Sequence, residues 1–384
     1  MALLGMVATH VLDSRDAAGD LTAAQWLAGG RASALFAVLA GASLALMTGG
    51  RQPVAGAERR ARRAGLAVRA LLIALVGLGL GELDSGLAVI LTYYGVLFLL
   101  GLPFVGFRAR TLLVMACAWA VLAPVLAQVL RPRLPERRFD NPSFEQLADP
   151  GPLLSELLIT GYYPCVPWLA FLLVGMAVAR MDLRSRAVQA YVAVGGLALA
   201  VVATLVSHWL TAREAVVQAL LPDAPTGVTT GPDLLDSIAG GMYGNTPAEG
   251  AWAWLLVVAP HSSTPVDLAQ STGSALFVIG VCVGVVGLWG RTVTRGISVL
   301  FGAGTMTLSL YSLHVVARTE ALWPAETSGT FRWHVLILLG IGAVFVALRW
   351  RGPLEAVVRA CADGVAALVR RASGRSARSS RTVG

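Results

Sequence analysis

Residues 160–180 read TGYYPCVPWLAFLLVGMAVAR, a stretch without an acidic or basic side chain before Arg180. A run of about 20 mostly apolar residues is long enough to cross a bilayer as an α-helix, because a helix satisfies its backbone polar groups internally. This stretch therefore predicts a membrane-spanning helix. Comparable stretches occur along most of the chain, so the same argument extends outward in both directions.

The composition agrees with a polytopic membrane protein. Of the 384 residues, 56% are hydrophobic and 14% are charged, and the mean hydropathy is +0.70. Soluble domains average about 45–50% apolar and about 25% charged residues, so an ordinary globular domain is excluded. The predicted fold is an all-α integral membrane bundle of about ten transmembrane helices. The expected crossings are residues 1–12, 29–49, 64–81, 86–107, 111–130, 160–180, 187–208, 268–290, 296–317 and 333–350.

The distribution of charge predicts an orientation. All 30 basic residues are arginines, and a cytoplasmic start with ten crossings places 21 of them, with four of the 22 acids, on the inner side. Basic residues concentrate in cytoplasmic loops. We therefore expect an inner or plasma membrane protein with both termini in the cytoplasm. The net charge of +8 then reflects topology and lipid contact, and no nucleic-acid partner is expected.

The chain divides into two expected parts: a membrane domain over 1–350 and a basic, partly disordered cytoplasmic tail over 351–384. The first apolar segment, Met1 to Leu12, is short for a crossing, so it predicts either a half-helix or a start that lies further upstream. Residues 251–260 (AWAWLLVVAP) are apolar but also too short, and their tryptophans favour a position at the membrane interface.

The histidines fall on one side of the predicted bundle. All five lie at outer helix ends or in outer loops: His10, His208, His261, His314 and His334. For His208 and His334, each beside a tryptophan, an interfacial side chain is the favoured interpretation. The four cysteines are scattered without a C-x-x-C pair, and no metal site is predicted.

Two histidines have polar neighbours at helical spacing. Asp13 follows His10 by three residues, so its carboxylate would orient the imidazole as a base if the helix continues; a helix-end cap is the alternative. Thr307, Tyr311 and His314 follow at i, i+4 and i+7, which predicts one polar face. Interhelical hydrogen bonding without chemistry is the alternative for this face.

Two further side chains are candidates for binding an acyl donor or an oxyanion. Arg31 is expected near the outer end of its helix, and Tyr94 lies well inside another, where a phenol needs a hydrogen-bond partner. Packing with a single hydrogen bond is the alternative for Tyr94. The inner arginine clusters set topology, and arginine also pairs with phosphate, which suits a phosphorylated donor such as coenzyme A.

Six stretches together resemble a known family: ALLGMVATHVLD (2–13), GRASALFAVLAGASLALMTG (30–49), ITGYYPCVPWLAFLLVGMAVARMDL (159–183), VVAPHSSTPVDLAQSTGSALFVIG (257–280), AGTMTLSLYSLHVV (303–316) and RGPLE (351–355). In this order they resemble the bacterial YeiB-like membrane proteins. That family is related to the catalytic domain of heparan-α-glucosaminide N-acetyltransferase, within the transmembrane acyltransferase superfamily.

The resemblance implies transfer of an acyl group from acyl-coenzyme A at the cytoplasmic side to an outer hydroxyl or amine acceptor. In enzyme relatives, a polar residue at the end of helix one and a histidine in the following loop serve the reaction. His10 matches the helix-end position, but residues 13–27 contain no histidine. Either His10 or His261 is therefore expected to replace the loop histidine.

The first hypothesis is consequently a membrane acyltransferase that uses acetyl-coenzyme A or another acyl-coenzyme A and no metal. His10 would deprotonate the acceptor, and Arg31 with Tyr94 or Thr307 would stabilise the oxyanion. The expected partners are membrane lipids, acyl-coenzyme A, an envelope glycan or small-molecule acceptor, and a second copy in a homodimer. A transporter or exporter of a small polar or lipid-linked molecule is the alternative, and a non-catalytic envelope protein is the third possibility.

Overall fold

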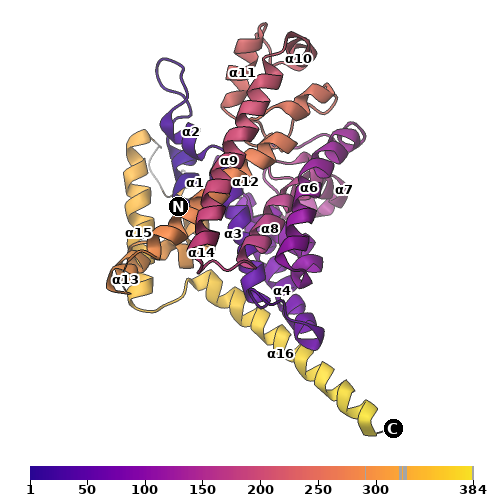
Figure 1. The fold of residues 1–384 in the computed structure, drawn as a ribbon, viewed down its shortest axis with the longest axis vertical. Coiled ribbons are helices and arrows are strands. Elements are labelled where there is room, and N and C mark those ends of the chain that lie inside the picture. Colours follow the sequence, from indigo (N-terminus) through magenta and orange to yellow (C-terminus); the bar gives the residue numbers. More distant parts are fainter. Residues whose placement is uncertain (290, 320–321, 323–326, 383–384) are drawn as a thin grey trace.

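The computed structural model describes residues 1–289, 291–319, 322 and 327–382. Within this part the chain is helical, and the only β pairing is an isolated bridge between Arg15 and Leu21. The predicted all-α class is confirmed. The molecule is elongated, with small helices α10 and α11 at one end and the long C-terminal helix α16 leaving the bundle at the other (Figure 1).

Six helices in the described residues are long and apolar enough to cross a membrane, or seven if one bent pair is a single crossing. Three shorter apolar helices accompany them, so the expected number of about ten crossings is not confirmed. The long ones are Ala23–Met47 (α2, Ala23–Ala28, with α3, Arg31–Met47), Gly56–Gly81 (α4), Ala109–Arg133 (α6, Ala109–Leu130, with η2), Arg186–Thr211 (α9), Pro265–Val286 (α12) and Ser328–Ala347 (η8 with α15, Phe331–Ala347). The short ones are Ala2–Val11 (α1), Leu91–Gly106 (α5, Leu91–Gly101, with η1) and Thr307–Ala317 (α14).

The apolar stretch 160–180 forms one arm of the bent pair. Helix α8 spans Cys165–Ala179, and α7 (Pro150–Ser155) continues into a π-helical turn, η4 (Glu156–Thr160), at 50° to it. The break falls on Gly161 to Pro164. Because proline disfavours helical backbone in the residue before it and lacks an N–H, Pro164 ends the preceding turn and starts the next helix.

The prediction of one continuous crossing over 296–317 is wrong. Helix α13 (Arg291–Leu300) is separated from α14 by a short 3-10 turn, η7 (Gly302–Thr305). Glu355 stabilises the new start, because its carboxylate accepts hydrogen bonds from the backbone N–H groups of Leu308 and Ser309 at 2.8 and 3.1 Å. An acidic side chain at a helix N-terminus satisfies N–H groups that have no partner within the helix.

Glycines allow the central helices to approach closely. Helix α3 packs along α8, and a Cβ atom at Gly175 would collide with the carbonyl oxygen of Val38. Helix α9 packs along α12, where Gly196 and Gly273 have the same role. Small residues are the usual means of close helix contact within membranes, since lipid supplies no hydrophobic driving force between helices.

The two ends of the bundle differ in construction. At one end α10 (Glu214–Leu220), α11 (Gly231–Ala239) and the 3-10 turn η6 (Trp252–Leu256) form a cap with its own small core around Trp254. Residues 251–260 therefore belong to this cap and do not cross the bundle.

At the other end α16 (Pro353–Thr382) packs along α4, with an ion pair of 3.4 Å between Arg370 and Glu58. The structure has helix as far as Thr382, and the expected partial disorder of this tail stays a prediction. The proposed division of the chain at residue 350 stays a prediction. Buried Arg180 at the same end donates to the carbonyl oxygens of Ala45 and Val105, which fixes the end of α3.

Candidate functional site

A polar cavity of about 310 Å³ lies between the bundle and its cap. His10, at the end of α1, and His261, in the loop before α12, both line it. The start of α3 contributes Gly30 and Ser33, and the tyrosines of the break before α8 contribute Tyr162 and Tyr163. The structure thus brings together two of the predicted catalytic histidines from distant parts of the chain.

His10 belongs to a row of three histidines. Its Nδ1 atom lies 3.1 Å from Nε2 of His314, and the two rings are stacked at 5.4 Å with an interplanar angle of 4°. Nδ1 of His314 lies in turn 3.3 Å from Nδ1 of His334 on α15. His314 and His334 are 2% and 4% exposed, so the row leads from the cavity into the protein.

Asp13 does not have the expected position. Helix α1 ends at Val11, so the chain has left the helix before Asp13, which is exposed. The imidazole of His10 therefore contacts His314 instead of a carboxylate. His208 lies on the exposed face of α9, apart from this row. The sequence did not single out His334, since an interfacial role was favoured for it.

His261 is held by aromatic rings and by a special backbone conformation. Its ring centroid is 4.8 Å from Tyr162, 5.6 Å from Tyr163 and 6.3 Å from Trp168, with which it is stacked. Its φ of 59° is left-handed, which is uncommon for a residue other than glycine and occurs often at functional sites. Part of the ring reaches the cavity, while Nδ1 is enclosed without a hydrogen-bond partner. Burial, and next the proximity of His10, lowers the pKa of His261 to about 4.

A second, larger cavity of about 430 Å³ lies further along the bundle. Its lining is mostly apolar, with α1 residues Ala2 to Leu4 on one wall and Arg69 and Glu355 as its charged groups. The predicted donor-binding residues Tyr94 and Thr307 line this cavity.

Two further predicted residues, Arg31 and Tyr311, have hydrogen-bond partners. Arg31 donates a hydrogen bond to the carbonyl oxygen of Trp26, and its guanidinium lies 5.8 Å from that indole ring. The Tyr311 hydroxyl accepts a hydrogen bond of 3.2 Å from the backbone N–H of Ile90. Neither residue lines the two cavities. The described residues contain no cluster of three or more His, Cys, Asp or Glu side chains arranged to hold a metal ion.

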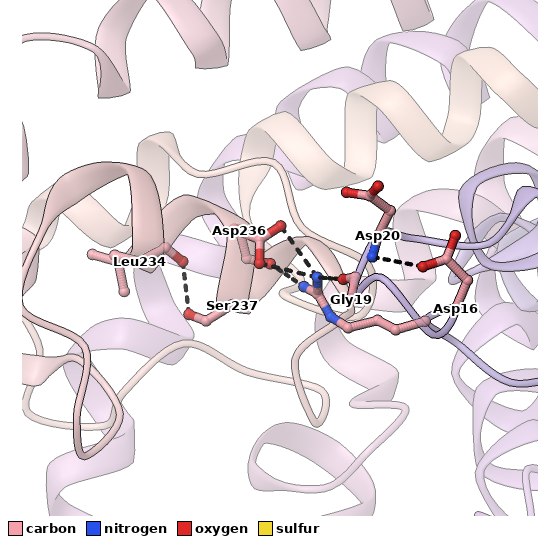
Figure 2. A network of polar contacts seen from close by, with 7 residues as sticks. Asp16, Gly19, Asp20, Leu234, Asp236 and Ser237 are labelled. Atoms are coloured by element: carbon pink, nitrogen blue, oxygen red, sulfur yellow. Dashed lines mark hydrogen bonds and ion pairs between the residues drawn. The ribbon is translucent and has the colours of Figure 1, made fainter.

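The N-terminal loop connects the cap to the polar cavity of about 310 Å³. Arg15 forms an ion pair of 3.0 Å with Asp236 of α11 and donates to the carbonyl oxygen of Gly19 at 2.6 Å. Figure 2 shows this loop beside α11, with Gly19 near Asp236; the Asp16 carboxylate accepts a hydrogen bond from the backbone N–H of Asp20, and the Ser237 hydroxyl donates to the carbonyl oxygen of Leu234. Close by, Gln25 donates to the carbonyl oxygen of Gly240 at 2.7 Å, and both residues line the same polar cavity.

Fold and site together define a multi-pass α-helical membrane protein with a histidine-lined cavity under a polar cap. A family model described as heparan-alpha-glucosaminide N-acetyltransferase, catalytic, matches residues 1–212, more than half of the chain, and the protein belongs to this family. The predicted relation to that catalytic domain is confirmed. The matched segment contains His10 and Tyr94, whereas His261, His314 and His334 follow it. Neither the curated proteins nor the solved structures contain a match to this chain.

Proposed function

We propose that this protein transfers an acyl group, expected to be acetyl, from cytoplasmic acyl-coenzyme A to a hydroxyl or amine of an envelope glycan or small molecule on the outer face. Membership of the N-acetyltransferase family supports the reaction class. The observation that carries the proposal is that the two cavities lie in series along the same helices, one with a donor's chemistry and one with an acceptor's.

The series arrangement follows from the lining residues of α1 and α3. The proposed topology makes the 430 Å³ cavity the inner cavity and the 310 Å³ cavity the outer cavity. Ala2 to Leu4 line the inner cavity, whereas Thr9 and His10 of the same helix line the outer cavity. The Tyr94 hydroxyl, from the inner cavity, donates a hydrogen bond of 3.1 Å to the carbonyl oxygen of Ser33, which lines the outer cavity. One hydrogen bond therefore links the walls of the two cavities.

The inner cavity suits the thioester arm of a coenzyme A donor. Its apolar walls match an alkyl thioester, and the Arg69 guanidinium is of the type that binds phosphate oxygens. Met1 and Glu355 line the same cavity, so the start of the chain and the start of α16 lie on one side of the protein. This placement supports the two segments lying on the same side of the membrane.

The outer cavity suits the acceptor. An acceptor O–H or N–H would lose its proton to Nε2 of His10, the ring nitrogen that is not paired with His314. The acceptor oxygen or nitrogen then bonds to the acyl carbon, the carbon–sulfur bond breaks, and the thiolate takes up a proton to leave as free coenzyme A. The Tyr94 hydroxyl, which donates to the Ser33 carbonyl oxygen in this structure, would have to turn to the acyl oxygen in order to stabilise the oxyanion.

The test combines donor binding with turnover. Coenzyme A should raise the melting temperature of the purified protein, whereas a control nucleotide such as GTP should not. Radiolabelled acetyl-coenzyme A should label an acceptor in envelope extracts, and His10→Ala should lower this rate by about 10²–10⁴-fold, as for loss of a general base.

The control for this test is His208→Ala, because His208 is an exposed histidine outside the site. It should label acceptors as the wild type does. Equal labelling by the His10→Ala protein would show that His10 is not the base. Absence of both stabilisation and labelling in the wild type would overturn the transferase and favour a transport function.

A further inference from the structure

The three histidines of the row have coupled protonation states, because each ring contacts the next through nitrogen atoms. His10, His314 and His334 come from α1, α14 and α15, and adjacent rings approach through nitrogen atoms at 3.1 and 3.3 Å. A neutral imidazole has one N–H donor and one bare nitrogen acceptor. In a row of such rings each hydrogen bond fixes which nitrogen the next ring must protonate, so the three tautomers are coupled.

The direction of the row follows from the site. A base at His10 needs a bare Nε2 toward the acceptor, so its proton sits on Nδ1 and is donated to Nε2 of His314. His314 then carries its own proton on Nδ1 and donates it to Nδ1 of His334. His334, as the acceptor from His314, has its proton on Nε2. Both nitrogen–nitrogen contacts, at 3.1 and 3.3 Å, are used once in this arrangement.

We propose that His314 and His334 form a proton relay that acts through His10 and spreads the charge which His10 acquires in the transfer reaction. This inference rests on the proposed function for its use. When Nε2 of His10 takes the acceptor proton, the Nδ1 proton of His10 shifts toward Nε2 of His314, and the Nδ1 proton of His314 shifts toward Nδ1 of His334, so that one positive charge is shared among the three rings. No bond to carbon changes and one net proton enters the row. The reverse moves return that proton for the departing thiolate.

The surroundings explain why charge delocalisation is useful here. His314 and His334 are almost fully buried, and a charge localised on one buried ring is costly. The Arg318 guanidinium acts on both His10 and His314, and its positive charge opposes a proton that stays on either ring. His261 also lines the cavity beside His10. A proton shared over three rings lowers the charge on each, which makes His10 a better base without an adjacent carboxylate. His314 and His334 are thus positioning residues, while His10 is the residue that touches the acceptor.

The direct test is ¹⁵N nuclear magnetic resonance of the full-length protein labelled in its histidine side chains. The wild type should show three imidazoles linked by two N–H···N couplings, with the Nδ1 protonated in two of them and the Nε2 protonated in the third. His334→Gln should change the ¹⁵N shifts of both His314 and His10. The change at His10 would be indirect, because the row connects His10 to His334 through His314. His208→Gln, which alters an exposed histidine elsewhere, should leave all three unchanged.

A kinetic readout uses acetyl-coenzyme A as the probe, with water as the acceptor and released thiol as the signal. His334→Gln should lower kcat by about tenfold and change KM by less than about twofold, since the ring that is lost takes no part in binding. A proton inventory in mixtures of H₂O and D₂O should be curved in the wild type, because several protons move, and linear in this variant. A residue with only a packing role would change neither the curvature nor the distant ¹⁵N shifts.

The possible outcomes separate the two proposals. Absent N–H···N couplings in the wild type would overturn the relay whether or not the protein turns over acetyl-coenzyme A, and this measurement requires no variant to fold. Unchanged shifts of His10 in His334→Gln would overturn it as well. Coupled tautomers in a wild-type protein that neither binds nor cleaves acetyl-coenzyme A would support the proton coupling and overturn the transferase function.

Discussion

At the scale of single residues, the burial of His261 determines the protonation state of its ring. Its left-handed backbone and its three aromatic neighbours hold the ring at the wall of the outer cavity. Because Nδ1 is enclosed without a partner, the protonated ring would be destabilised, and the pKa falls from 6.5 to about 4. The imidazole is consequently neutral at pH 7 and able to accept a proton.

This shift predicts a pH-dependent stability. The folded-state pKa lies below the unfolded value, so the unfolded chain binds more protons between pH 6.5 and 4, and stability should be lost as the pH falls through that window. Lowering the pKa of His261 from 6.5 to about 4 corresponds to roughly 3 kcal/mol, and to less where the ring reaches the cavity. His261→Asn keeps a residue that tolerates left-handed backbone and removes the titration. Denaturant unfolding in detergent should therefore be less sensitive to acid in this variant. Parallel curves for the two proteins between pH 6.5 and 4 would contradict the prediction.

The residues of the site were only partly predictable. The charge distribution placed all five histidines at the outer side, and the structure gathers His10, His261, His314 and His334 around one cavity and the row behind it. Sequence spacing paired His10 with Asp13 because it assumed a continuing helix. The real partner is 304 residues away, and a contact of this kind depends on the rotation of α14 about its axis, which hydropathy does not encode.

At the scale of helices, apolar composition located the elements but not their breaks. The stretches 160–180 and 296–317 are mostly apolar, yet the first begins in a bend and the second contains the turn before α14. A hydropathy average is the same for a continuous and an interrupted helix. The causes are local: Pro164 in the first case, and in the second the carboxylate of Glu355, which binds the start of α14 from a distant part of the chain.

Close packing of α3 on α8 leads to a prediction about one methyl group. A Cβ atom at Gly175 would overlap the Val38 carbonyl oxygen, whereas Gly195 on α9 has no atom within 4 Å of its Cβ position. Gly175→Ala should therefore lower the free energy of unfolding by about 1–3 kcal/mol, as overpacking typically does. Gly195→Ala, the matched control, should be neutral or slightly stabilising because alanine favours helix. Thermal unfolding of both variants in the same detergent measures the difference. Equal melting temperatures would show that α3 and α8 are packed less closely.

At the scale of the whole molecule, structure and charge support the same axis. The cap of α10 and α11 and the helix α16 lie at opposite ends of the bundle (Figure 1). The inner assignment holds 21 of the 30 arginines, and among them Arg370 binds Glu58 while Arg180 fixes the end of α3. The histidines and the outer cavity lie toward the cap. An acyl donor from the cytoplasm and an acceptor from outside would thus each reach the cavity that suits its chemistry.

This axis predicts which residues an impermeant reagent reaches. Cys361 is exposed on α16. A variant can retain it as the sole cysteine if the other three, Cys117, Cys165 and Cys282, are replaced by alanine. Cys361 in this variant should resist a charged maleimide in intact cells and react with it in inside-out vesicles. Asp20→Cys in the same background, with Cys361 also replaced, should behave in the opposite way, because Asp20 is exposed in the loop beside the cap. The physical reason is that the arginine-rich loops are retained in the cytoplasm during insertion. Labelling of Cys361 in intact cells would invert the axis, and the inner cavity would then open to the outside, where cytoplasmic acyl-coenzyme A does not reach it.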